Sequence, residues 1–112
     1  GESAPKASRT MIRQLEEDQK RRSKRALTDA IDRALIDLLA IYRDVLMIQV
    51  GGDGELINTD LADLVGQIAS DSTPRQTLAR VDHIETARKR LVSNGNPLLV
   101  LEDMAISLRP QA

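Results

Sequence analysis

The sequence contains one long stretch, from Thr10 to Val50, without a single Gly or Pro. Gly and Pro are the residues that most often end or bend a helix, and this stretch is instead rich in strong helix formers. In its second half, the residues at three- and four-residue spacing are mostly apolar: Leu27, Ile31, Ala34, Leu35, Leu38, Leu39, Tyr42, Val45, Leu46 and Gln49. That spacing is typical of one buried helix face. The stretch predicts a very long helix, about 60 Å at 1.5 Å per residue.

The first half of this stretch lacks the apolar pattern. No large apolar residue lies between Leu15 and Leu27. The acidic residues 16–18 precede the basic residues 20–22 by four positions, an orientation that supports a solvent-exposed helix through weak ion pairs. A compact domain of this size has a radius of gyration of only about 13 Å. We therefore expect the first half to protrude into solvent, rather than to bend back near Ser23 or to pack on another chain.

The apolar residues are almost entirely aliphatic. Tyr42 is the one aromatic residue, and the sequence contains no Phe, Trp or Cys. The core must therefore consist of Leu, Ile, Val, Ala and Met, a composition that favours helices over strands. The absence of Cys excludes disulfides and thiolate metal ligands. Charges interrupt the apolar stretches before they reach the length of a membrane span, and no leader pattern is present, so we expect a cytoplasmic protein.

Turn and cap signals divide the rest of the chain into three shorter helices. The breaks fall at four places: Gly51-Gly52-Asp53-Gly54, Asp71-Ser72, Asn94-Gly95 and Arg109-Pro110. The predicted caps are Asn58 or Thr59, Thr73 and Asn96. Thr73 marks the strongest helix start, because Pro74 occupies the first helical position and Gln76 follows the cap by three residues.

Three sets of residues are expected to face the core: Leu61, Leu64, Val65 and Ile68; Leu78, Val81, Ile84, Arg88 and Leu91; and Leu98, Leu101, Met104, Ala105 and Leu108. The sequence thus predicts an all-α fold, a bundle of about four helices with a very long first helix. Residues 1–9, which are small and polar with one Pro, are expected to form a flexible linker or an expression remnant. Residues 10–112 are expected to form one helical domain, the C-terminal piece of a longer protein.

The charge pattern contains one sharp feature, a basic run around Ser23. It consists of Lys20, Arg21, Arg22, Lys24 and Arg25. We expect this run mainly to form a solvated helix face whose charge is balanced by the preceding acidic residues. The alternatives are that it contacts an acidic neighbouring subunit or the phosphate backbone of a nucleic acid. The net charge of −1 gives no overall attraction to nucleic acid or anionic membranes, and the lack of aromatics argues against stacking on single strands.

No catalytic or cofactor-binding pattern stands out, so we expect neither an enzyme nor a cofactor. A phosphate-binding Gly-rich loop is absent. The Gly51–Glu55 run lacks the carboxylate spacing of a calcium loop, so it is interpreted as a helix-ending turn rather than a metal site. His83 is the only histidine and lies among charged residues, which favours a surface position.

Two charged residues, Arg43 and Asp44, interrupt the most apolar part of the long helix. At least one of them must lie near the edge of the core, where a charge is stable only when paired and hydrogen-bonded. A structural network is therefore favoured over catalysis. Asn94 and Glu102 are candidate partners, or else a cap residue and a surface acid.

Three segments occur in a characteristic order: Arg33-Ala34-Leu35-Ile36-Asp37-Leu38 leading into Tyr42-Arg43-Asp44-Val45-Leu46; Asp82-His83-Ile84-Glu85-Thr86-Ala87-Arg88-Lys89-Arg90-Leu91; and Asn94-x-Asn96-Pro97-Leu98-Leu99-x-Leu101-Glu102. They resemble the C-terminal collar domains of the δ′ and γ/τ subunits of the bacterial DNA polymerase III clamp loader. The Lys/Arg-rich segment before Leu27 resembles an insertion in high-GC Gram-positive δ′ proteins. Together the likeness covers about residues 10–109 and points most closely to δ′, without separating it securely from γ/τ.

The resemblance implies an oligomerisation domain with no active site of its own. In the family, five collar domains form a ring that holds the clamp loader together, while ATPase-type domains, absent here, lie elsewhere in the chain. The implied partners are γ/τ and δ, and DNA is met only through the whole complex. Tyr42, Arg43, Asp44, Asn94 and Glu102 are family-motif positions that we interpret as maintaining the fold. The alternatives are a stand-alone adaptor that homodimerises through its long first helix and, on the basic run alone, a small nucleic-acid-binding protein.

Overall fold

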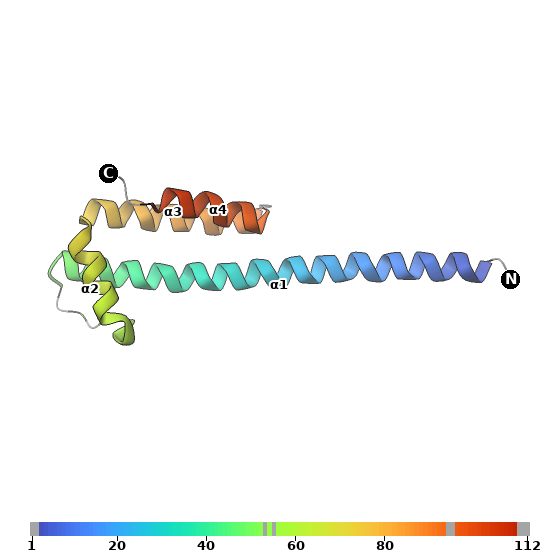
Figure 1. Cartoon of the computed structure of the whole chain (residues 1–112), viewed down its shortest axis with the longest axis horizontal. Coiled ribbons are helices and arrows are strands. Elements are labelled where there is room, and N and C mark those ends of the chain that lie inside the picture. The colour runs from blue at the N-terminus through green and yellow to red at the C-terminus, as the bar shows by residue number, and fades with distance from the viewer. Residues whose placement is uncertain (1–2, 53, 55, 94–95, 110–112) are drawn as a thin grey trace.

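The computed structural model describes residues 3–52, 54, 56–93 and 96–109, with side chains from Lys6 onward. Within these residues, four α-helices and one short 3₁₀ helix follow each other (Figure 1): α1 (Ser3–Gln49), η1 (Thr59–Leu61), α2 (Ala62–Asp71), α3 (Pro74–Ser93) and α4 (Pro97–Ser107). The described part of the chain contains no strand. The predicted all-α fold with a very long first helix is confirmed.

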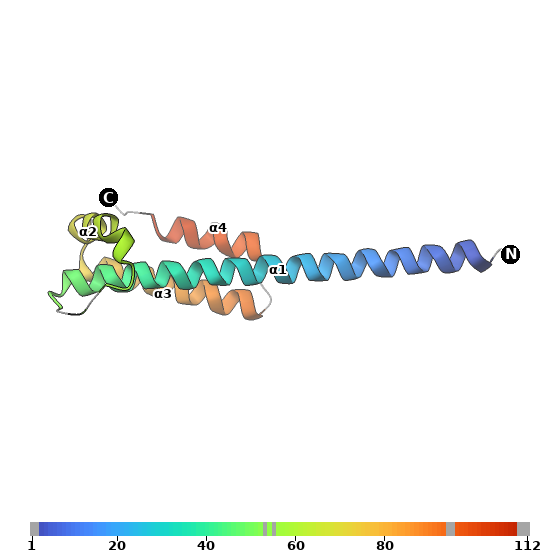
Figure 2. The ribbon, with the colours of Figure 1, turned by 90° about the horizontal axis from the view of Figure 1, so that it is seen from below.

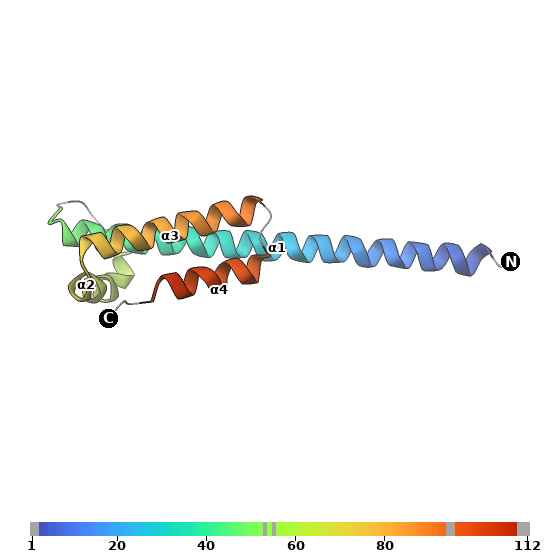
Figure 3. The ribbon, with the colours of Figure 1, turned by 90° about the horizontal axis from the view of Figure 1, so that it is seen from above.

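The molecule is elongated because α1 is about twice as long as the bundle that packs on it. The principal extents are 76 × 29 × 19 Å, and the radius of gyration is 20.9 Å, well above the value of about 13 Å for a compact domain of this size. The N-terminal half of α1 projects beyond the other helices in all three views (Figures 1 to 3). Every side chain from Lys6 to Leu27 is exposed. The predicted protrusion is confirmed.

The start of α1 differs from the expected flexible linker at residues 1–9. The helix begins at Ser3, so residues 3–9 continue it, while residues 1 and 2 lie outside the described part. The proline at position 5 lies in the first helical turn, where a missing N–H removes no intrahelical hydrogen bond. The small polar residues after it do not interrupt the helix.

The core lies where α3 and α4 pack side by side on the C-terminal half of α1 (Figures 2 and 3). Its buried residues come from all three helices: Ile31, Leu35, Ile84, Ala87, Leu91, Val100 and Met104. Leu38, Leu39, Tyr42 and Leu108 pack against them and are partly buried. α2 also packs on α1, and Val45 of α1 and Val65 of α2 are both completely buried.

The predicted inward face of α4 is partly wrong. Pro97, Val100 and Met104 are buried, whereas Leu98 and Leu101 are exposed, as is Ala105. Because residues 98–101 are all apolar, two helix faces fit the sequence equally well, and packing against α1 and α3 selects the face that contains Pro97. Leu64 of α2 and Leu78 of α3, also predicted to point inward, are likewise exposed.

Most of the predicted helix ends are confirmed. Asn96 caps α4 by accepting hydrogen bonds from the backbone N–H groups of Leu98 and Leu99. Thr73 and Gln76 form the reciprocal capping box at the start of α3. Asn58 differs, because its side chain makes no cap hydrogen bond. The predicted break at residues 94–95 falls outside the described residues.

Candidate assembly surface and the contacts that position it

Asp44 is the buried charge of the domain, with only 2% of its surface exposed. Its carboxylate accepts two backbone hydrogen bonds, from Ile57 N to Oδ1 and from Asn58 N to Oδ2, both at 2.8 Å. The Asn58 side-chain amide donates a third, at 3.0 Å to Oδ2. These contacts attach the loop before η1 to α1. Asp44 therefore closes a structural network, as favoured from the sequence, and its partners are in this loop.

Burial by itself raises the pKa of Asp44. The hydrogen bonds from Ile57 and Asn58, together with the neighbouring charge of Arg43, outweigh that effect and hold the pKa below its ordinary value. The folded domain therefore favours the ionised carboxylate. A group of this kind stabilises a fold and is a poor general base.

A second polar network fixes the corner where α1, α2 and α3 meet. The Gln49 side-chain Nε2 donates to Ala69 O at 3.3 Å and to Ser72 O at 3.0 Å, at the end of α2. Its Oε1 accepts a hydrogen bond of 2.7 Å from Thr77 Oγ1, and Thr77 is completely buried in α3. One amide thus connects three helices. The sequence indicated only that Gln49 continues the apolar face of α1.

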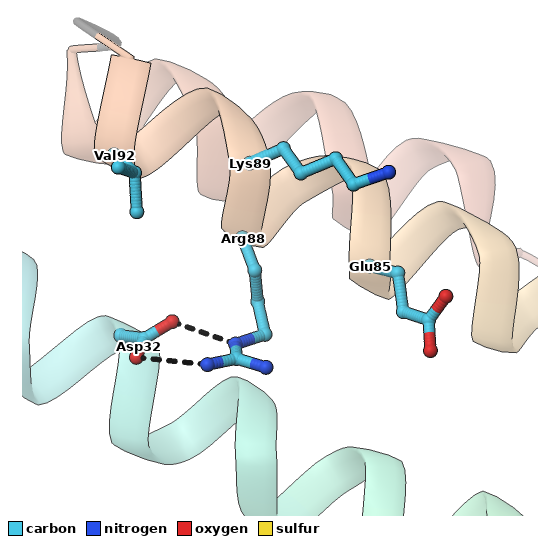
Figure 4. A pocket seen from close by; sticks show the side chains of 5 residues that line it. All are labelled: Asp32, Glu85, Arg88, Lys89 and Val92. Atoms are coloured by element: carbon cyan, nitrogen blue, oxygen red, sulfur yellow. Dashed lines mark hydrogen bonds and ion pairs between the residues drawn. The ribbon is translucent and has the colours of Figure 1, made fainter.

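An ion pair joins α1 and α3 near the point where the projecting half of α1 leaves the bundle (Figure 4). Arg88 Nε lies 2.8 Å from Asp32 Oδ1, and its Nη2 lies 3.4 Å from Oδ2. The hydrogen bond to Asp32 raises the pKa of Arg88 above its ordinary value. The pair forms part of an open hollow of about 420 Å³ that also contains Glu85, Lys89 and Val92. Because both side chains remain partly exposed, the pair aligns the helices more than it stabilises them.

The remaining family-motif residues have different positions. Tyr42 is half-buried against the core, with the Arg80 guanidinium 5.9 Å from its ring centre. Arg43 and Glu102 are exposed. Glu102 is therefore not a partner of Asp44, and Asn94 falls outside the described residues.

The basic run is fully exposed on the projecting half of α1. Its five cations are Lys20, Arg21, Arg22, Lys24 and Arg25. One ion pair within α1 involves this run, between Arg21 and Asp18. Where this half of α1 meets the bundle, Lys24 lines a hollow of about 520 Å³ together with Leu27, Pro97 and Leu98.

The described residues contain no group of three or more side chains placed to hold a metal ion. His83 is exposed on α3, as expected. Gly51, whose φ of +70° is the left-handed conformation that glycine adopts easily, lies in the turn that follows α1. Across the described part of the chain, no helix is both long enough and apolar enough to cross a membrane.

The clearest candidate for an interaction surface is the outer face of α4, which we define as Leu98, Leu99 and Ile106. These three side chains are 56%, 54% and 60% exposed. Leu101 beside them is also exposed. The exposed Glu102 lies between Leu98 and Ile106 on this face. Exposed large apolar side chains on one helix, with polar residues around them, are typical of protein–protein contacts. The opposite side of the same helix is buried on α1 and α3, so the bundle holds this face in a fixed orientation.

Comparisons with known proteins agree with the resemblance found in the sequence. Residues 8–109 match the family model described as DNA polymerase III, delta subunit, C terminal. Over 72 residues, the chain is 39% identical to DNA polymerase III subunit delta' of Bacillus subtilis (strain 168), a match that covers 64% of this chain and 22% of that relative. No solved structure matches the chain.

The family match spans nearly the whole chain, including the four helices and the outer face of α4. It also agrees with the expectation that this chain is not itself an enzyme. The protein belongs to the family of C-terminal domains of the DNA polymerase III delta subunits.

Proposed function

We propose that this chain is the oligomerisation domain of a DNA polymerase III δ′ subunit, and that it joins the other subunits of the clamp loader, γ/τ and δ, in a collar. In this proposal, residues 10–112 are the collar domain of a longer protein, and contact with the clamp-loading machinery comes through the assembled complex. The domain itself performs no chemistry.

The outer face of α4 is the observation that supports this proposal best. Leu98, Leu99 and Ile106 are more than half exposed, although Val100 and Met104 of the same helix are buried in the aliphatic core. Exposing such a face to water is unfavourable, by roughly 25 cal/mol for each Å² of apolar surface. A permanent partner removes that cost. The family membership supports other subunits of the same polymerase complex as the class of partner.

The face belongs to a bundle whose other helices are held together by polar networks. Asp44 and Gln49 hold the loop and the ends of α2 and α3 on α1, and α4 packs on α1 and α3. An interface presented by a pre-ordered bundle loses little conformational entropy on binding. This suits a subunit that acts as a fixed part of a larger ring.

The test is co-purification of the chain with the C-terminal domains of the other clamp-loader subunits from the same genome, followed by analytical ultracentrifugation. A defined hetero-oligomer is expected. The double variant Leu99→Asp/Ile106→Asp should abolish it while circular dichroism remains helical, because both positions are exposed in the isolated domain.

The matched control changes two exposed apolar residues on the projecting half of α1, Met11→Asp/Leu15→Asp. If the proposal is correct, this control assembles like the wild type. A homodimer that forms without any other subunit, and that only the Met11/Leu15 control destroys, would instead establish the stand-alone adaptor. That alternative has one observation in its favour, the exposed Met11, Ile12 and Leu15 near the free end of α1.

A further inference from the structure

The charge of this protein is divided between two separate parts of the molecule. The projecting half of α1, residues 6–26, which we call the basic arm, carries eight basic residues and three acidic ones, a net charge of +5. The whole chain has a net charge of −1, so the rest of it carries −6. The net charge of the chain is therefore near zero because a strongly basic arm is attached to an acidic bundle.

The separation in space is large enough for the two charges to act independently. The arm is about 30 Å long at 1.5 Å per residue, whereas the Debye length at physiological ionic strength is about 8 Å. A ligand near the N-terminal part of the arm therefore experiences the electrostatic potential of the arm and very little of the potential of the bundle. The net charge of −1 is an average over two parts of the molecule that a ligand meets separately, so it does not exclude nucleic acid as a ligand of the arm.

The cations of the arm are also ordered. At 100° per residue, five of them fall within a sector about 60° wide along one side of the helix, and we call this set the basic ridge: Lys6, Arg9, Arg13, Lys20 and Lys24. All five are exposed, and none takes part in an ion pair among the described contacts. Glu16 and Glu17 lie at the two edges of the ridge, between Arg13 and Lys20. The ridge continues the side of α1 that, further along, packs in the bundle through Ile31 and Leu35.

We propose that the basic arm binds the phosphate backbone of double-stranded nucleic acid without sequence preference. The ridge presents cations along about 27 Å of helix, and a duplex carries one phosphate charge per ≈1.7 Å of its axis. The arm has no aromatic side chain on which unpaired bases stack, which favours a duplex over a single strand. Lys24, at the inner end of the ridge, lines the same hollow as Leu98 of the outer face of α4, whereas the other four ridge cations lie further out on the arm.

Two other anionic partners fit the arm less well. The centre of a protein interface is usually apolar, but no large apolar residue lies within the basic ridge, and Met11 and Leu15 lie on the opposite side of the helix. Binding to a membrane surface requires a continuous apolar helix face. The arm has only three large apolar residues, within little more than one turn, and Arg22 lies on the same side further along. The arm therefore lacks such a face. Phosphate contacts require only the exposed cations.

The test measures fluorescence anisotropy of a labelled, mixed-sequence DNA duplex titrated with the whole chain, at salt concentrations from about 50 to 200 mM. With five ridge cations and a slope of about −0.9 for each phosphate contact, log K against log[salt] should have a slope of about −4 to −5. A parallel titration uses an RNA duplex of the same sequence. Equal binding to both supports recognition of the shared phosphate backbone, whereas strong preference for one DNA sequence contradicts it.

Two triple variants with the same change in net charge locate the site. Arg13→Ala/Lys20→Ala/Lys24→Ala removes three ridge cations and should reduce the slope to about −2, because two contacts remain. Arg33→Ala/Arg75→Ala/Arg109→Ala removes three exposed cations outside the arm and should leave both affinity and slope unchanged. Alanine favours helix, so circular dichroism should show both variants folded.

Three results would overturn the proposal. The first is an equal loss of binding in both triple variants, which would make the attraction a property of overall charge. The second is binding to vesicles of anionic lipid without binding to the duplex. The third is a self-associated species, lost in the ridge variant, in a chain that does not bind the duplex; this would assign the arm to the acidic bundle of a second copy.

Discussion

Replacing Asp44 by Asn tests the central claim that one buried carboxylate holds the loop before η1 on α1. The variant keeps the size of the side chain but removes its charge and replaces one accepting oxygen by a donor. In the wild type, Ile57 N donates to Oδ1 at 2.8 Å, and the two Asn58 donors bond to Oδ2 at 2.8 and 3.0 Å. The single carbonyl oxygen of asparagine can replace only one of these two oxygens, so the hydrogen bonds to the other are lost. A hydrogen bond to a charged group contributes about 1.5 to 3 kcal/mol. We therefore expect the free energy of unfolding to fall by about 2 to 4 kcal/mol at pH 7.

Urea denaturation followed by circular dichroism measures this loss, with Asp37→Asn as the matched control. Asp37 lies on the same helix but is exposed, so its substitution should change the stability by less than about 0.5 kcal/mol. A loss below about 1 kcal/mol for the Asp44 variant would refute the reasoning, because it would mean that water satisfies the Ile57 and Asn58 donors equally well.

The pH dependence provides a second, independent check on the same residue. Because the folded state lowers the pKa of Asp44, its stabilising effect is fully present above the unfolded pKa of about 3.9 and is lost as the pH falls through the folded value. The stability difference between the wild type and Asp44→Asn should thus be constant from about pH 5 to 8 and should shrink below about pH 4. A difference that stays constant down to pH 2 would contradict the lowered pKa.

Three further predictions concern the bundle and the arm. Thr77→Val should destabilise the domain by about 1 to 3 kcal/mol, because it leaves the Gln49 oxygen without its buried donor; a double-mutant cycle with Gln49→Ala should give a coupling energy clearly different from zero. Ile84→Ala, at a fully buried site, should cost about 2 to 5 kcal/mol, whereas Leu78→Ala on the exposed side of α3 should cost less than about 1 kcal/mol in thermal or chemical unfolding. Deleting residues 1–22 should reduce the helical circular dichroism signal but change the free energy of unfolding by less than about 0.5 kcal/mol; a larger loss would mean that the arm packs on the bundle in solution.

The polar contacts illustrate what could be inferred without coordinates. That Asp44 belongs to a structural network followed from an acidic residue inside an apolar helix face. Its partners did not follow, because Ile57 contributes a backbone N–H that any residue could supply. The side chain of Asn58, interpreted as a helix cap, is turned to the carboxylate instead. Gln49 was recognisable only as a polar residue on the buried side of α1, and its three partners come from two later helices.

The sequence by itself determined the helical class, the very long first helix and where it ends, the capping box of α3 and the protrusion of the arm. These features depend on residues close together in the chain: runs without Gly or Pro, three- and four-residue periodicity, and cap residues at fixed offsets. The order of charges that defines the basic ridge is also local, since a continuous helix fixes the angle between its side chains.

Only the tertiary structure decided which side of α4 is buried and which forms the outer face. Residues 98–101 are apolar at every position, so local spacing gives no preference, and contact with α1 and α3 selects Pro97, Val100 and Met104. This outcome depends on the relative placement of helices that are distant in sequence, which local spacing does not encode.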